Sequence, residues 1–131
     1  LEAVPHLVAG LHFGRLLGEE QALEMLHARK DRIRKLVVVC LMPLPGTLMS
    51  GIQLAFGPEE FGRLLARARQ LLPETELALG CARPRDKRGE DFELAALEAG
   101  VTRMALFSER TRRRAEELGR EITVEGTCCS R

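Results

Sequence analysis

Apolar runs and helical stripes alternate along the chain. Residues 36–47, LVVVCLMPLPGT, begin as β-branched and apolar residues with no polar face, which is the pattern of a strand covered on both sides in a parallel sheet. Pro43, Pro45 and Gly46 then end the strand, because proline cannot donate to a strand ladder. In parallel α/β proteins, ligands bind at this carboxyl end of the strands.

The same pattern places the other elements. Helix signals are acidic residues in a first turn, basic residues in a last turn and apolar residues at helical spacing, with Phe61, Leu64, Leu65, Ala68 and Leu72 on one inner face. Asp86 to Glu90 is polar and is expected to be a loop. The predicted strands are 4–13, 36 onward, 77–80, 103–107 and 122–124, and the predicted helices are 19–30, 58–72, 91–99 and 109–118.

Strands that alternate with helices over short connections predict parallel strands joined by right-handed crossovers. Four and a half βα units amount to about half of an eight-unit barrel. The sequence therefore predicts an α/β fold, a partial TIM barrel in a single domain over residues 1–131. Its inner face would need a partner chain or a second copy. The alternative is a small flavodoxin-like sheet with helices on both faces.

Composition narrows the class of protein. The chain has 131 residues, of which 45% are hydrophobic and 30% charged, and its net charge is only +1, so a nucleic-acid or membrane partner is not expected. The four cysteines, with no secretory leader and no long apolar run, predict a reducing, cytoplasmic location. The basic run 110–114 is followed by Glu116 and Glu117 and is interpreted as a solvated helix face.

Residue types able to bind ligands gather where the predicted strands end. In a parallel sheet these ends lie at one edge, so the side chains should share one mouth. They are His12 and Gly14, then Pro43, Pro45, Gly46 and Thr47, then Cys81 and Arg83, then Ser108, and finally Cys128 and Cys129.

Four segments in a row resemble one enzyme family. VAGLHFGRLLGEEQAL is similar to the glycine-rich fifth-strand region of radical S-adenosylmethionine enzymes of the biotin synthase and lipoyl synthase type, and LMPLPGTLM to their sixth-strand motif. LALGCARP resembles the seventh strand and AGVTRMALFS the eighth. The resemblance covers almost the whole chain in the right order. It implies the C-terminal half of such a barrel, which supplies cofactor and substrate walls to radical chemistry such as sulfur insertion on a small molecule.

The resemblance also implies ligands. S-adenosylmethionine would contact Gly10, His12, Gly14, Glu19, Pro43, Pro45, Gly46 and Thr47, and an auxiliary iron–sulfur cluster would lie beside Cys81, Arg83, Cys128 and Cys129. The CxxxCxxC motif that holds the four-iron cluster of this family does not occur in the sequence. We therefore expect that cluster to be bound by an N-terminal half-barrel or a partner chain, and this chain not to cleave the cofactor alone.

Each of these residues also has a structural interpretation. Cys40 is expected to be a small buried hydrophobe, Glu19 to cap its own helix, and Arg83 to pair with a carboxylate such as Asp86. His12 and the cysteines at the mouth could be inert. A non-catalytic binding or metal-scaffold half-barrel that works with a partner chain is thus the alternative function. A phosphate-binding half-barrel lacks a clear glycine-rich loop beyond residues 14–19.

Overall fold

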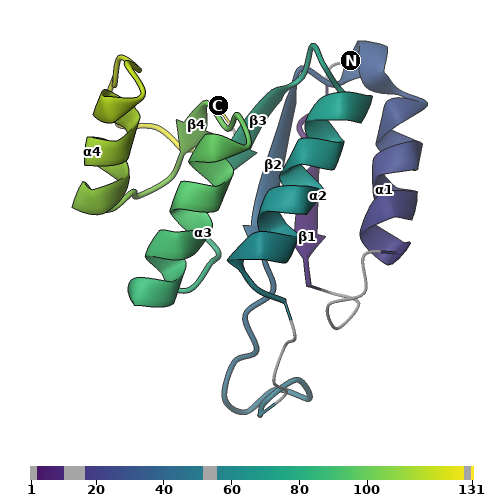
Figure 1. Ribbon diagram of the computed structural model, residues 1–131. Helices are drawn as coiled ribbons and strands as arrows, with labels where there is room; N and C mark the ends of the chain where they lie inside the picture. Colours follow the sequence, from purple (N-terminus) through teal and green to yellow (C-terminus); the bar gives the residue numbers. More distant parts are fainter. Residues whose placement is uncertain (1–2, 11–16, 52–55, 129–130) are drawn as a thin grey trace.

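Strands and helices alternate along the chain in the computed structural model, which describes residues 3–10, 17–51, 56–128 and 131 (Figure 1). The elements of these residues are β1 His6–Ala9, α1 Leu17–His27, the 3-10 helix η1 Lys30–Arg32, β2 Lys35–Cys40, α2 Pro58–Leu71, β3 Glu76–Leu79, α3 Lys87–Glu98, β4 Arg103–Met104 and α4 Glu109–Glu117. The predicted α/β fold is confirmed at this level.

The strands form one open parallel sheet in the order β1-β2-β3-β4. Every strand therefore lies beside its neighbour in the chain. Helices α1, α2 and α3 pack in one layer on a single face of this sheet (Figure 1). A flavodoxin-like sheet would carry helices on both faces, and the shared layer of these three helices does not fit that alternative.

The core lies between the sheet and this helical layer. Leu36 and Val38 of β2 and Leu77 and Leu79 of β3 are fully buried. Against them pack the predicted inner-face residues of α2, Phe61, Leu64, Leu65, Ala68 and the following Leu72. Cys40 also joins this core at 4% exposure, and burial raises the pKa of its thiol to about 12. Its predicted structural role is confirmed.

The opposite face of the sheet, here called the inner face, is different. By strand alternation it carries Val37, Val39 and Ala78, together with a row of charged residues at the amino ends of the strands. Lys35 Nζ lies 3.6 Å from Glu76 Oε2, and Arg103 Nε lies 3.3 Å from Glu76 Oε1. No helix among the described elements packs on Val37 or Ala78.

The C-terminal segment attaches to this charged row. Arg103 Nη1 lies 2.6 Å from Glu125 Oε2, and Lys35 Nζ donates a hydrogen bond to the carbonyl of Arg131. The fifth strand that we expected over residues 122–124 is not formed; these residues belong to neither strand nor helix, and Val124 is 81% exposed. The ion pair to Glu125 holds the segment by a side chain, not by a ladder of backbone hydrogen bonds.

Three further boundaries differ from expectation. Asp86 caps α3, because its Oδ1 accepts from the backbone of Arg88 at 3.0 Å and of Gly89 at 3.2 Å, so residues 87–90 are helix and not loop. β4 ends at Met104 and not at 107, since Leu106 adopts a φ of 53°, which a strand cannot accommodate. β1 covers His6–Ala9, so Val4 and Pro5 lie outside the strand, whereas residues 11–13 of the expected 4–13 lie outside the described residues.

Candidate functional site

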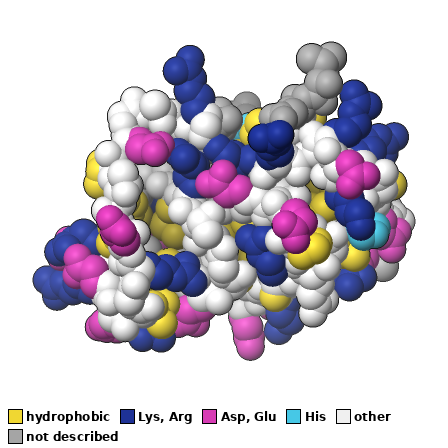
Figure 2. Space-filling view, turned by 90° about the horizontal axis from the view of Figure 1, so that it is seen from above, with side chains coloured by type: hydrophobic (Ala, Val, Ile, Leu, Met, Phe, Trp, Pro, Cys, Tyr) yellow, Lys and Arg dark blue, Asp and Glu magenta, His cyan; other side chains and the backbone are white. Residues whose placement is uncertain are grey.

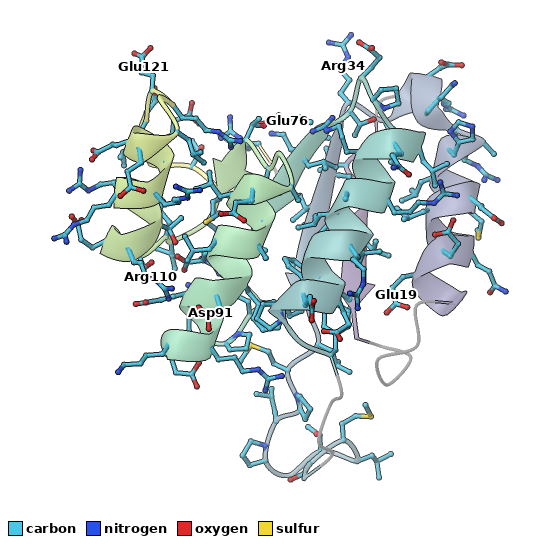
Figure 3. The ribbon with its side chains drawn as sticks, in the orientation of Figure 1. Glu19, Arg34, Glu76, Asp91, Arg110 and Glu121 are labelled. Carbon is cyan, nitrogen blue, oxygen red and sulfur yellow. The ribbon has the colours of Figure 1, made fainter. Side chains whose placement is uncertain are left out.

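The carboxyl end of β1 is joined to the first turn of α1. Gly10 adopts a φ of 87°, a conformation that favours glycine, and its N–H donates to Glu19 Oε1 at 3.0 Å. Glu19 is only 1% exposed, and Figure 3 shows it at the end of α1 nearest this edge of the sheet. Glu19 thus binds the strand end, and its Oε2 has no hydrogen-bond partner among the described residues.

The predicted cofactor wall after β2 forms a turn that projects from the same edge (Figure 1). Thr47 Oγ1 donates to the carbonyl of Leu44 at 2.7 Å, so its hydroxyl serves the turn itself. Pro45 and Gly46 are exposed to solvent and Pro43 is half-buried, whereas the atoms nearest to a Cβ built on Gly10 belong to Phe56. The predicted residues His12, Gly14 and Cys129 lie outside the described residues.

Arg83 is enclosed and not open to the mouth. It is 0% exposed; its Nη1 donates to the carbonyl of Gly80 at 2.7 Å, and its Nη2 lies 3.0 Å from Glu93 Oε1. A further hydrogen bond from Nη2 holds the carbonyl of Leu106. Arg83 therefore pairs with a carboxylate, as its structural interpretation required, but the partner is Glu93 and not Asp86.

Glu93 links this arginine to α4. Its Oε2 accepts from the backbone of Ser108 at 2.8 Å and from Thr111 Oγ1 at 2.6 Å. Burial acts to raise the pKa of Glu93, but the hydrogen bonds from Thr111, Ser108 and Arg83 outweigh it and the pKa lies below its ordinary value. One sign of this network is visible in the sequence: a glutamate lies on the buried stripe of α3, next to Phe92.

A groove of about 970 Å³, here called the edge groove, runs along the outer side of β4. Residues 101–107 form one wall, and residues 120–125 with Thr127 and Cys128 form the other. Cys81 also lines the groove, and both Cys81 and Cys128 are exposed. The structure thus places the two cysteines along one cavity, whereas Arg83 lies in the core.

The described residues do not fit an auxiliary iron–sulfur cluster. Such a cluster needs several thiolate or imidazole ligands that converge, and the part of the chain that the structure describes holds no group of three histidine, cysteine or carboxylate residues able to bind a metal ion. At the carboxyl end of β1, Glu19 Oε2 is a buried acceptor without a hydrogen-bond donor among the described residues.

The arginines of α4 are paired with carboxylates on the surface. Arg112 and Arg113 contact Glu109, and Arg114 contacts Glu117 and Glu98. The hydrogen bond from Arg112 lowers the pKa of Glu109 to about 2. Figure 2 shows acidic and basic side chains intermixed over one face of the molecule. This agrees with a solvated helix face.

Comparisons of the chain with protein-family models, with curated proteins and with solved structures find no match. No described helix is both long and apolar enough to cross a bilayer. The candidate binding sites are therefore the two that the structure itself indicates: Gly10 with Glu19 at one edge of the sheet, and the edge groove beside β4.

Proposed function

We propose that the chain forms half of a barrel of the radical S-adenosylmethionine type and supplies cofactor and substrate walls at its carboxyl edge. The observation that carries this proposal is the topology. Four parallel strands follow one another in chain order, and α1, α2 and α3 lie on one face. In a TIM barrel all helices lie outside and successive strands are neighbours, so this arrangement supports a barrel segment.

Partly exposed apolar residues on the inner face are the reason to propose complementary strands. A barrel interior is filled by side chains from opposing strands, but Val8, Val39 and Ala105 remain partly exposed here. Covering such apolar surface stabilises the assembly by roughly 25 cal/mol for each Å² removed from water. The proposal is that further strands, from the same polypeptide or from another chain, cover this face.

The ligand site of the proposal is the carboxyl edge around Gly10 and Glu19. Bound S-adenosylmethionine would supply radical chemistry in the completed barrel, with the four-iron cluster held by the complementary strands. The residues of this chain would bind and orient the cofactor: the Gly10 backbone allows close approach, and Glu19 Oε2, which is buried without a hydrogen-bond partner among the described residues, would accept a hydrogen bond from it.

The test is a titration of the isotopically labelled chain with S-adenosylmethionine, followed by amide chemical shifts. We expect shifts at Gly10 and Glu19, and about a ten-fold weaker dissociation constant for Glu19→Gln, since losing one charge-assisted hydrogen bond costs about 1.4 kcal/mol or more. Glu20→Gln is the matched control, because Glu20 is in the same turn but pairs with Arg67 at the surface. Equal affinities for the two variants, or no shifts at this edge, would contradict the proposal.

A second candidate is a non-catalytic half-barrel that binds a partner chain. The partly exposed Val8, Val39 and Ala105 of the inner face support it, because a partner chain would cover them. Anaerobic reconstitution of the full assembly with iron and sulfide distinguishes the two. The enzyme proposal predicts bound iron and cofactor cleavage, whereas the binding module predicts a complex with neither. Cys81→Ala and Cys128→Ala variants test in the same assay whether these thiols hold any iron.

A further inference from the structure

The edge groove offers a second binding site, separate from the carboxyl end of β1. We propose that it binds a small organic anion with an apolar body, the anionic group on Arg120 and the body along β4. This proposal does not rest on the half-barrel proposal, because it uses only groups that the chain itself brings together.

The size and lining of the groove indicate a small molecule. Its volume of about 970 Å³ lies at the upper end of the roughly 300–1,000 Å³ typical of small-molecule sites. Apolar side chains make up much of both walls, with Val101, Met104 and Phe107 on the β4 side and Ile122 and Val124 on the other. An inorganic ion would leave this apolar surface in contact with water, so the occupant should carry a hydrocarbon or aromatic part.

The arginines that line the groove decide the charge of the ligand. Arg103 is already bound to the carboxylates of Glu76 and Glu125, and Arg112 to those of Glu109 and Glu116. Arg120 is different. Its Nη1 donates only to the carbonyl of Val101 at 3.2 Å, and it makes no ion pair with any described residue.

Glu121 is the nearest acidic residue in the sequence, and it too lines this end of the groove. Figure 3 shows it at the tip of the turn after α4, pointing away from the sheet. The guanidinium of Arg120 therefore keeps donors for a ligand, and a guanidinium binds carboxylate or phosphate in a bidentate manner. The anionic group is placed at the Val101 end, and the apolar body extends past Met104 toward Phe107.

A ligand in this position would occupy the outer edge of β4. That edge is also where a strand must pair to extend the sheet into a barrel. Ligand and completing strand therefore compete for the same edge. The two proposals are tested separately, because amide shifts at Val101 and Met104 report on the edge groove, whereas shifts at Gly10 and Glu19 report on the proposed cofactor edge.

Decanoate, kept below its micelle-forming concentration, is the probe. Titrated into the isotopically labelled chain, it should shift the amides of Val101, Met104 and Ile122 and leave Gly10 unchanged. Arg120→Gln should weaken the dissociation constant about ten-fold, as expected for one lost ion pair, and Arg120→Lys less. Arg113→Gln is the matched control, because Arg113 is an exposed arginine of α4 outside the edge groove.

Two further probes separate the charge from the apolar body. Acetate should bind far more weakly than decanoate, and decyltrimethylammonium, which has the same chain and the opposite charge, should also bind weakly. Equal binding of the cationic probe, equal affinity of the Arg120→Gln variant, or shifts confined to the inner face would overturn the proposal. So would the absence of any shift with decanoate. Circular dichroism of each variant checks that the fold is kept.

Discussion

The two faces of the sheet are built from the same strands, but different groups bury the side chains on each face. On the helix side, Leu36, Val38, Leu77 and Leu79 meet side chains from three helices. On the inner face, Val37 and Ala78 are equally buried, yet no described helix packs on them. There, the partly buried Val39 and Ala105 pack against them.

This difference indicates that the helix side contributes most of the stability of the fold and that the inner face tolerates substitutions better. The helix side combines aromatic packing, with the rings of Phe61 and Phe92 centred 5.3 Å apart, and the buried Arg83–Glu93 pair. The inner face relies on a row of ion pairs in which Lys35 is buried and Glu76, Arg103 and Glu125 are accessible to solvent, and solvent-accessible pairs contribute little each. We therefore expect substitutions on the helix side to unfold the chain, and substitutions on the inner face mainly to free the C-terminal segment.

Replacing Phe61 by alanine should have the largest effect. Phe61 is 0% exposed, and truncation of a buried phenylalanine lowers the free energy of unfolding by about 3–5 kcal/mol. Val39→Ala on the inner face is the comparison, and because Val39 is only partly buried we expect about 1 kcal/mol. Urea unfolding of both variants measures the difference. Similar losses would mean that the inner face contributes as much as the core.

Glu93→Gln should be nearly as severe, with a loss of about 3 kcal/mol at neutral pH, because the buried Arg83 charge loses its counter-charge. The wild-type pKa of Glu93 is lowered by folding. Its contribution is therefore complete above its unfolded pKa of about 4.3, and it is lost as the pH falls through the lower folded pKa. The difference in unfolding free energy between wild type and variant should thus shrink below about pH 4.3. A constant difference down to strongly acidic pH would contradict this.

Gly80→Ala tests how closely the inner face is packed. A Cβ at this position would lie 2.4 Å from Val39 Cγ1 and 3.0 Å from Val37 Cγ1, and β-branched side chains have little freedom to move away. We expect a loss of about 1–3 kcal/mol from overpacking. Combining Gly80→Ala with Val39→Ala should recover part of that loss, as seen in a double-mutant cycle. Purely additive losses would show that the clash is relieved elsewhere.

Arg103→Gln should have the smallest effect on stability, below about 1 kcal/mol, because its partners are solvent-accessible. Its local effect should be larger. Without the ion pair to Glu125, the backbone of residues 120–128 should show lower NMR order parameters, while that of β2 stays rigid. Arg113→Gln, which breaks a surface pair on α4, is the control and should leave residues 120–128 unchanged.

Helix ends were predictable because their signals are local. Pro58 at the start of α2, Pro73 after it, and Ser108 before α4 each act through their own backbone or through residues three positions away. The strand β2 was predictable from its unbroken apolar run. Asp86 acts just as locally, as the cap of α3, but the polar residues after it resembled a loop.

The pairing of Arg83 with Glu93 could not be predicted from the sequence. Several carboxylates are within reach along the sequence, and the choice depends on how α3 lies against the end of β3. The strand predicted over residues 122–124 was wrong for a different reason. Their alternation is typical of a strand, but whether a short strand pairs depends on the neighbouring edge, which here is separated from them by the edge groove. Of the candidate site, sequence reasoning placed Cys81 at a strand end and Glu19 in the first turn of a helix, but it did not find the edge groove or the position of Arg120 beside it.

The sequential strand order also bears on how the chain acquires its fold. The main contacts between elements join consecutive strands or consecutive helices, or a helix to the strand before it, so each new element packs on one that precedes it directly. Parallel pairing still joins residues well separated in the chain, such as His6 with Val37 and Lys35 with Glu76, and closing such connections is the slow part of folding. During synthesis, each βα unit can pack on the one before it as soon as it emerges.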